Sequence, residues 1–186
     1  MIRRATPAEY ETVIDVLSDA FNTDPLTTWL FPDTTNLATT LYFHPLLTHP
    51  AAEADLTTGN TAAAIWLRLA PGQSPYGDAS TLPAHRLHEL GQALAPRHPR
   101  DEAYLYLPCM GVTPAHRGTG LGSAMLRHRL SWADSLGIGT YLEASSPRSR
   151  ALYLRHGFHD HGEPIRLADS PAIWPMWRPT TTGDHR

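Results

Sequence analysis

The chain has 186 residues, a length that fits one compact domain and is too short for two comfortable ones. Apolar residues make up 41% of it and charged residues 18%, so it carries enough core-forming side chains to fold by itself. The formal net charge of -3 comes without a long basic run, which argues against nucleic acid as the main partner.

Neither a membrane nor an oxidising compartment is indicated by the sequence. The first seven residues lack the apolar region of a secretory signal, and no stretch approaches ~18 consecutive apolar residues. Cys109 is the single cysteine, which excludes an intramolecular disulfide and leaves no thiol cluster for a metal. We therefore expect a cytoplasmic protein, a monomer or a homodimer, with no membrane partner.

The first quarter of the chain predicts one strand and a set of helices. After a short strand over residues 2–5, Thr6-Pro7-Ala8-Glu9 has the form of a helix start, because Thr6 can cap the helix and Pro7 fits its first turn. Apolar residues then recur at the 3.6-residue period of a helix up to Phe21. Residues 26–49 are rich in aromatic and leucine side chains and contain two prolines, which favours two short helices with a loop.

A hairpin and a long irregular segment follow. The sequence Thr57-Thr58-Gly59-Asn60 is typical of a turn between two strands, here near residues 54–57 and 62–69. Residues 71–100 are broken by repeated glycine and proline, with one helix expected near residues 85–94. We expect this segment to be a lid-like insertion over a site.

The second half alternates strands and helices. Residues 104–112 form an almost unbroken apolar run, typical of a strand covered on both faces, yet Pro108 within it cannot donate to a ladder. We therefore expect this strand to be bent or splayed. Later elements are expected at residues 118–137 and 146–157 (helices) and 140–144, 158–161 and 173–177 (strands).

This order of elements predicts an α/β fold with one mixed sheet and helices on both faces. We assign residues 1–179 to a single domain and residues 180–186 to a disordered tail.

A glycine-rich turn lies between the buried strand and the next helix. It runs from Val112 to Ser123, with closely spaced glycines at 118, 120 and 122. Glycines let the backbone approach an anion closely, and a helix N-terminus contributes about half a positive charge. Arg117 adds a planar donor fork suited to phosphate, so a diphosphate fits this turn better than a carboxylate.

The residues of this turn exclude two other phosphate-binding motifs. A tight turn that binds no ligand remains the alternative. A P-loop needs a lysine, and this chain has none. A dinucleotide fingerprint needs Gly-x-Gly-x-x-Gly, which differs from the spacing of Gly118, Gly120 and Gly122.

What the turn resembles is the acetyl-CoA signature of the GNAT superfamily of N-acetyltransferases. The match is Arg-x-x-Gly-x-Gly from Arg117 to Gly122, preceded by Gly111-Val112-x-Pro114. Residues 141–148 and 152–158 resemble the second half of these enzymes, in particular the branch that contains puromycin N-acetyltransferase. The blocks Phe21-x-x-Asp24-Pro25, Trp29-Leu30-Phe31-Pro32-Asp33 and His98-Pro99 are similar to that branch too.

The resemblance implies a GNAT-like fold with a central splayed sheet, in which residues 7–49 give acceptor-side helices and residues 102–158 the acyl-CoA core. It implies no metal, and acetyl-CoA as co-substrate. The implied contacts to acetyl-CoA are Met110, Gly111, Val112, Arg117, Gly118, Thr119, Gly120, Leu121, Gly122, Ser123 and Ser149. At position 149 the family pattern has Asn, whereas this sequence has Ser149.

The resemblance also implies that Tyr153, in Leu-Tyr-x-x-x-Gly-Phe, is the catalytic general acid. A tyrosine of ordinary pKa about 10 is a weaker acid than a thiol of about 8.5, so hydrogen bonding to the leaving thiolate is its expected contribution. A core tyrosine with a surface hydroxyl is the alternative.

Glu143 is the candidate general base. Alternation along the strand puts it on one face with Tyr141 and Ser145. The carboxylate could take the amine proton directly or through water, or could serve as an acceptor for nearby backbone or arginine groups, and both interpretations stay open.

Acceptor binding is expected upstream. Asp24 and Asp33 occur among Trp29, Phe31 and Tyr42, a set that could bind a cationic amine beneath aromatic rings, with simple packing of the rings as the alternative. His159 and His161 share a strand face but lack a third ligand, so no metal is expected.

Together these features predict transfer of an acetyl group from acetyl-CoA to the amine of a small molecule, such as an antibiotic or a natural-product intermediate, by direct attack through a tetrahedral intermediate. The alternatives are acylation of a protein or peptide amine and a non-catalytic CoA-binding sensor. Tyr153 favours an enzyme.

Overall fold

The computed structural model describes residues 1–32, 39–76 and 85–181. Asp33, part of the expected insertion and most of the expected tail lie outside these ranges.

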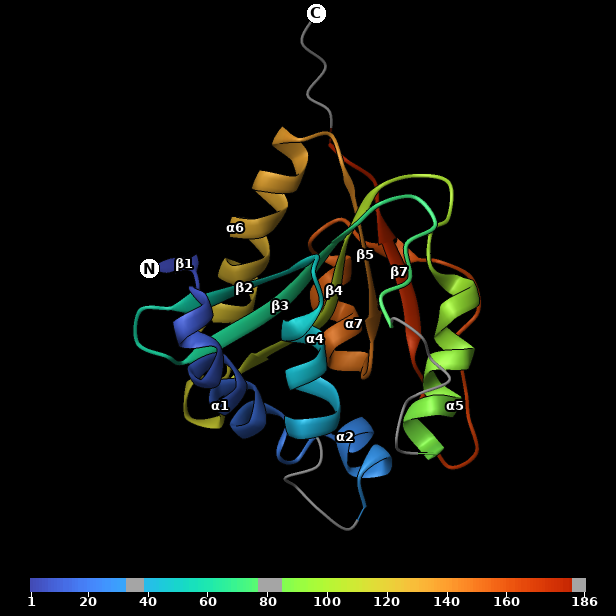
Figure 1. Cartoon of the computed structure of the whole chain (residues 1–186), viewed down its shortest axis with the longest axis horizontal. Helices are drawn as coiled ribbons and strands as arrows, with labels where there is room; N and C mark the ends of the chain where they lie inside the picture. The colour runs from blue at the N-terminus through green and yellow to red at the C-terminus, as the bar shows by residue number, and fades with distance from the viewer. Residues whose placement is uncertain (33–38, 77–84, 182–186) are drawn as a thin grey trace, which may run out of the picture.

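A seven-stranded sheet forms the centre of the molecule, in the order β1-β2-β3-β4-β5-β7-β6 (Figure 1). Only the β4–β5 pair is parallel, and all the other pairs are antiparallel. The strands are β1 (Ile2–Arg4), β2 (Ala52–Thr57), β3 (Ala62–Leu69), β4 (Tyr104–Val112), β5 (Gly139–Ala144), β6 (His159–Asp160) and β7 (Trp174–Arg178).

Helices cover both faces of this sheet, which confirms the mixed α/β prediction. One apolar core holds the buried residues of α1 (Tyr10–Phe21), α2 (Pro25–Leu30), α4 (His44–Thr48) and α5 (His85–Leu94). A second core holds those of α6 (Leu121–Ser135) and α7 (Pro147–Leu154). In the part of the chain that the structure describes, no helix is both long and apolar enough to cross a bilayer.

Short turns of other helix types join these elements. They are Pro7–Glu9, Ala95–Arg97 and Pro114–His116, which are 3₁₀-helical, and Thr39–Phe43, which is π-helical. The expected capping box is present at the first of them, where the Thr6 amide donates to Glu9 Oε2 at 2.9 Å.

The sheet splays between β4 and β5, as the proline in the apolar run predicts. The two strands pair from Tyr104↔Gly139 only as far as Leu107↔Leu142, whereas β4 stays paired with β3 up to Val112. A bulge in β4 lies at the same point, because Ile65 pairs with Cys109 but Leu67 with Tyr106. A gap therefore opens along one side of the second half of β4.

Backbone alternation decides which amides face this gap. The Thr113 amide donates to the Thr61 carbonyl at 2.9 Å, so Gly111 also faces β3 and the amides of Met110 and Val112 face the gap. Pro108 lies two residues before Met110, so its backbone nitrogen faces the same side of the strand as the Met110 amide. Its missing N–H thus falls on the side without a partner strand, where no ladder donor is lost.

Glycine conformations limit both C-terminal helices. Gly118 and Gly120 have φ values of 82° and 85°, which a right-handed helix does not admit, so α6 begins at Leu121, within the expected segment of residues 118–137. Gly157, at φ 85°, follows α7, which ends at Leu154.

A buried ion pair fixes α6 to the sheet. The Arg129 guanidinium donates to both carboxylate oxygens of Asp55 on β2, at 2.9 and 2.7 Å, and to Glu53 Oε2 at 2.6 Å. The side chains of Arg129 and Asp55 are 4% and 2% exposed. This contact holds the helix whose N-terminus follows the glycine turn.

Candidate active site

The glycine turn presents an open backbone surface at the start of α6. A Cβ built on Gly118 or Gly120 would meet no atom within 4 Å, so the space over both glycines is free. The first internal bond of α6 is from the Ala124 amide to the Gly120 carbonyl, at 3.0 Å. The amides of residues 121–123 are thus left without helix partners, as at any helix N-terminus. This turn fits the pyrophosphate of a CoA molecule.

Three of the polar side chains expected at this turn have partners within the protein. Arg117 Nη2 donates to the Ala20 carbonyl of α1 at 2.7 Å, while the residue is otherwise exposed. Thr119 Oγ1 donates to the His116 carbonyl at 2.7 Å, and Ser123 Oγ lies 3.1 Å from His156 Nε2. Their contacts to acetyl-CoA stay predictions. The backbone amides at the start of α6 are more available to a ligand than these three side chains.

Gly111 has a packing role. A Cβ there would lie 2.5 Å from Ala20 Cβ and 3.2 Å from Phe21 Cε2, so only glycine lets α1 approach β4 this closely. Because its amide faces β3, the geometry favours Met110 and Val112 over Gly111 as backbone donors to a ligand in the gap. At Gly122, by contrast, a Cβ would lie 3.5 Å from Leu152 Cδ2, an ordinary contact, so the packing of α6 on α7 does not require glycine there.

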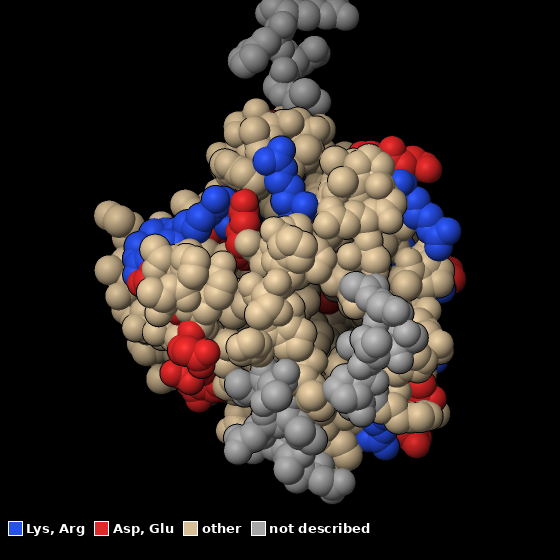
Figure 2. Space-filling view, in the orientation of Figure 1, with Lys and Arg blue, Asp and Glu red and all other residues tan. Residues whose placement is uncertain are grey.

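A cavity of about 360 Å³ lies beside this gap, and Figure 2 shows the corresponding hollow on the molecular surface. Its wall contains residues of α2, α4, α5, β4, β5 and α7, including Met110, Glu143, Ser149 and Tyr153. Two of the expected donor-side residues, Met110 and Ser149, and both expected catalytic residues therefore line one cavity, while residues 117–123 of the turn lie outside its wall.

Glu143 lies at one end of this cavity, within a network of buried aromatic side chains. Tyr106 Oη donates to Glu143 Oε2 at 2.9 Å, and His98 Nε2 lies 3.1 Å from Glu143 Oε1. The side chains of His98 and Glu143 are only 5% and 7% exposed. His98 also contacts two tyrosine hydroxyls, Tyr76 at 3.0 Å through Nε2 and Tyr104 at 2.9 Å through Nδ1.

One arrangement of protons satisfies these contacts. If the Tyr104 hydroxyl donates to Nδ1 of His98, the Nε2–H is directed between Tyr76 and Glu143 Oε1. The Tyr76 hydroxyl is then free to donate to Tyr106, 3.4 Å away, which in turn donates to Glu143. This chain of donors ends on Glu143 Oε2. The Nε2–Oε1 approach is oblique, and Oε1 has no well-aligned hydrogen bond of its own.

Burial keeps the tyrosines of this network protonated. It raises the pKa of Tyr106 and of Tyr76 well above the ordinary value, and the nearby charge of Glu143 raises both further. The two hydroxyls therefore remain hydrogen-bond donors over the whole physiological pH range.

Tyr153 is a buried residue of the cavity wall, 8% exposed. Burial raises its pKa, with a smaller contribution from Cys109, so its hydroxyl is protonated. Burial likewise raises the pKa of the Cys109 thiol, which lines the same cavity and is present as a thiol rather than a thiolate.

Ser149 lines the cavity while forming a capping box at the start of α7. Its amide donates to Ser146 Oγ at 3.1 Å, and its hydroxyl donates to the Ser146 carbonyl at 3.0 Å. The serine that stands in place of the expected asparagine thus has a local structural role, and its contact with acetyl-CoA stays a prediction.

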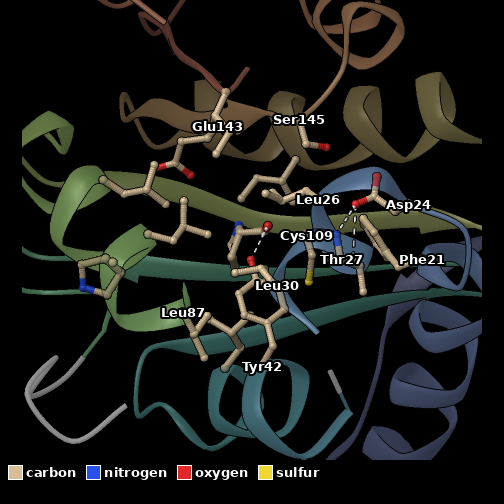
Figure 3. A pocket seen from close by; sticks show the side chains of 18 of the residues that line it. Phe21, Asp24, Leu26, Thr27, Leu30, Tyr42, Leu87, Cys109, Glu143 and Ser145 are labelled. Carbon is tan, nitrogen blue, oxygen red and sulfur yellow. Dashed lines mark hydrogen bonds between the residues drawn. The ribbon is translucent and has the colours of Figure 1, made fainter. Parts of the chain in front are cut away.

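Three of the four expected acceptor residues line the cavity, namely Asp24, Phe31 and Tyr42. Tyr42 donates to the Pro108 carbonyl at 3.2 Å, and Asp24 Oδ2 caps α2 by accepting from the Thr27 amide at 2.9 Å (Figure 3). Trp29 lies outside the cavity wall: its Nε1 donates to the Ala168 carbonyl at 3.1 Å, and Arg86 stacks on its ring. The contacts of Trp29 agree with the alternative that this ring serves packing rather than amine binding.

Sequence reasoning missed the residues around Glu143, although part of the signal was present. Tyr104 and Tyr106 share one face of a strand, Tyr141 and Glu143 share one face of another, and the two strands pair side by side with Tyr106 opposite Tyr141. His98 arrives from the irregular segment before β4, and no periodicity locates such a residue.

No group of three or more histidine, cysteine, aspartate or glutamate side chains within residues 1–32, 39–76 and 85–181 could hold a metal ion.

A seven-stranded sheet that splays beside a glycine turn, with a cavity at the gap, defines the class of acyl-CoA transferases. Residues 24–158 match the family model described as acetyltransferase (GNAT) family, and the chain belongs to this family. It is accordingly an acetyltransferase whose donor is acetyl-CoA.

Solved structures agree over nearly the whole chain. A protein from Corynebacterium glutamicum described as histone acetyltransferase HPA2 and related acetyltransferase is 29% identical, with a TM-score of 0.71, over 97% of this chain and 96% of that one. Drosophila melanogaster polyamine N acetyltransferase is 16% identical, with a TM-score of 0.73, over 96% and 99%. A Sinorhizobium meliloti phosphinothricin acetyltransferase in complex with AcCoA is 15% identical, with a TM-score of 0.60, over 100% and 91%. The last two show likeness of fold alone.

Proposed function

We propose that this chain transfers the acetyl group of acetyl-CoA to the amine of a small molecule. The observation that carries the proposal is one cavity that extends from Met110, beside the β4–β5 gap, to the buried carboxylate of Glu143. Donor and acceptor sides therefore meet in a space of about 360 Å³, within the range of small-molecule sites.

Acetyl-CoA, when bound, supplies an acetyl group activated as a thioester. The α6 amides and the glycine turn would hold its pyrophosphate, and the amides of Met110 and Val112 would hold the chain that leads to the thioester. Both sites offer backbone N–H groups without a partner in the protein. Such groups fit the phosphate and amide oxygens of acetyl-CoA.

Glu143 is the proposed base. Its carboxylate accepts a proton from the ammonium of the acceptor, and the freed lone pair attacks the thioester carbon to form the new C–N bond of a tetrahedral intermediate. When this intermediate collapses, the C–S bond breaks with its electron pair on sulfur, and the nitrogen loses its second proton to water. The alternative is that Glu143 serves only as an acceptor for Tyr106, an interaction that exists in either case.

Tyr153 is proposed to donate a hydrogen bond to the departing sulfur. Because burial raises its pKa, complete transfer of its proton to a thiolate is less favourable than ordinary values suggest. We therefore assign the hydroxyl mainly to stabilising the thiolate charge, with water as the final proton source.

Direct attack fits this cavity better than a covalent enzyme intermediate. Cys109 is the single cysteine of the chain, and its raised pKa disfavours the thiolate that an acyl-enzyme would need. The amine is thus proposed to attack the thioester itself through a tetrahedral intermediate.

The resemblance to the puromycin N-acetyltransferase branch supports an antibiotic or natural-product amine as acceptor. The solved relatives are described as acting on different amines, so they do not select one. A cytoplasmic location, where acetyl-CoA is available, is part of this proposal.

Release of free CoA thiol, measured with acetyl-CoA and a panel of small amines, tests the proposal. We expect thiol release that depends on the amine, and a kcat lowered at least about tenfold in Tyr153→Phe, which removes the hydroxyl and keeps the ring. Tight acetyl-CoA binding with no turnover on any amine would instead identify a sensor. Turnover only with peptides would identify the peptide-amine alternative.

A further inference from the structure

The wall of the cavity is mostly apolar where it faces away from Glu143. Leucines from three helices form this part of the wall, and aromatic rings complete it. The residues are Leu26 and Leu30 of α2, Leu46 of α4, and Leu87, Leu90 and Leu94 of α5, together with Phe21, Phe31 and Tyr42. A ligand with an apolar body would exchange water for these side chains, which is favourable by roughly 25 cal/mol per Å² buried.

The charged groups in this wall are carboxylates. They are Glu143 and Asp24, which lie at opposite sides of the cavity in Figure 3. Asp24 already uses one oxygen to accept from the amide and hydroxyl of Thr27, at 2.9 and 3.2 Å. Glu143 keeps a buried oxygen, Oε1, without a well-aligned hydrogen bond. An ammonium group would supply the donor that this oxygen lacks.

No positive charge is available to an anionic substrate group. Within the described ranges, the wall contains no arginine, and the chain contains no lysine. Its one histidine within these ranges, His49, has Nδ1 occupied by a hydrogen bond from the Ala51 amide at 3.0 Å. Residues 33–38 and 77–84 contain no basic side chain either.

We infer that the acceptor is an amine with an apolar body and without any anionic group, and that its ammonium binds at Glu143. A free amino acid is disfavoured, because its carboxylate would be buried beside two carboxylates and apolar carbon with no cation to pair it. This inference rests on the proposed function and narrows its substrate class.

Three matched acceptor amines separate the effect of a carboxylate charge from the effect of the size of the group that carries it. Phenethylamine, phenylalaninamide and phenylalanine share one skeleton, and the amide reproduces the size and polarity of the carboxylate without its charge. We expect kcat/KM for phenethylamine to exceed that for phenylalanine by about a hundredfold or more, with the amide closer to phenethylamine. Equal or better use of phenylalanine would overturn the inference.

A cavity variant tests the apolar wall. Leu90→Ala removes buried wall area, so kcat/KM for phenethylamine should fall about tenfold while that for ethylamine, which is too short to fill the wall, changes little. Comparing two amines in the same variant separates lost contact from lost folding. Leu136→Ala, at an exposed leucine of the α6 end, is the matched control and should leave both values unchanged. An equal fall for both amines in Leu90→Ala would count against the apolar wall as the binding surface.

Failure of the inference and failure of the proposed function give different results. Good turnover of phenylalanine, or of ethylamine over phenethylamine, would leave an N-acetyltransferase with another acceptor class. Absence of thiol release with every amine, although acetyl-CoA binds, would contradict the proposed function itself.

Discussion

At the scale of single residues, the position of Glu143 depends on its neighbours. Two donors, the Tyr106 hydroxyl and the His98 imidazole, approach its two oxygens at 2.9 and 3.1 Å. Both donors are buried, so the carboxylate has little freedom to turn toward solvent. A base that must meet an ammonium in one place benefits from this fixed orientation.

His98 is therefore a positioning residue in this account. His98→Phe keeps a ring but removes both nitrogens, which contact Glu143 and two tyrosine hydroxyls, and we expect kcat to fall about tenfold or more because the carboxylate loses its fixed orientation. The affinity for acetyl-CoA should be unchanged, because His98 lies at the acceptor end of the cavity. Steady-state kinetics and acetyl-CoA titration measure the two quantities.

The conservative variant separates positioning from packing. His98→Gln can restore an N–H donor near Glu143 and should recover part of the lost kcat, whereas His128→Gln, at an exposed position of α6, should change nothing. If His98→Phe retained full kcat, the network would have only a packing role.

At the scale of elements, the contact of α1 with β4 at Gly111 shapes the donor side of the site. Gly111→Ala would place a methyl group 2.5 Å from Ala20 Cβ, so α1 or β4 must shift. We expect the free energy of unfolding to fall by about 1–3 kcal/mol, as for overpacking elsewhere, measured by urea denaturation. Gly59→Ala is the control: its nearest contact would be 3.6 Å, and its stability should stay close to that of the unchanged protein. No loss of stability in Gly111→Ala would contradict the close approach of the two elements.

The buried ion pair between α6 and β2 gives a second prediction at this scale. Arg129→Ala leaves Asp55 buried without its partner, and we expect a loss of about 3–5 kcal/mol in unfolding free energy. The matched control is Arg150→Ala, which removes an exposed ion pair with Asp160 and should lower the free energy of unfolding far less than Arg129→Ala does. Equal effects of the two changes would show that the Arg129 pair does not hold the helix.

The elements were predictable from the sequence wherever a local rule governs them. The hairpin at Asn60, the splay at Pro108 and the helix start at Ser146 follow from turn chemistry, a missing donor and a cap, and the structure has each of them. The helix expected within residues 118–137 is present as α6, but its first residue depends on the positive φ of Gly118 and Gly120, which the apolar pattern does not reveal.

At the scale of the whole molecule, the candidate site depends on residues that only the tertiary fold brings together. His98, Tyr106 and Glu143 come from an irregular segment and two strands, and their meeting requires the β4–β5 register. The same holds for Trp29: its aromatic character suggested a binding ring, while long-range contacts with Arg86 and Ala168 assign it to packing. The sequence predicts the acetyl-CoA turn because the residues of that turn are contiguous. It does not predict which residues line the cavity, because these come from distant parts of the chain.

Glu143 is proposed to accept the amine proton in this cavity. The most direct test is the pH dependence of acetyl transfer by Glu143→Gln, with the acetylated amine quantified by mass spectrometry and acetyl-CoA affinity measured in parallel. Glutamine keeps the shape and an acceptor for Tyr106 but cannot take a proton. We expect the kcat of this variant to be lowered by about a hundredfold or more near neutral pH and partly recovered at higher pH, where the free amine is more abundant, with acetyl-CoA affinity unchanged. A Glu143→Gln protein with the activity and pH profile of the unchanged enzyme would contradict it.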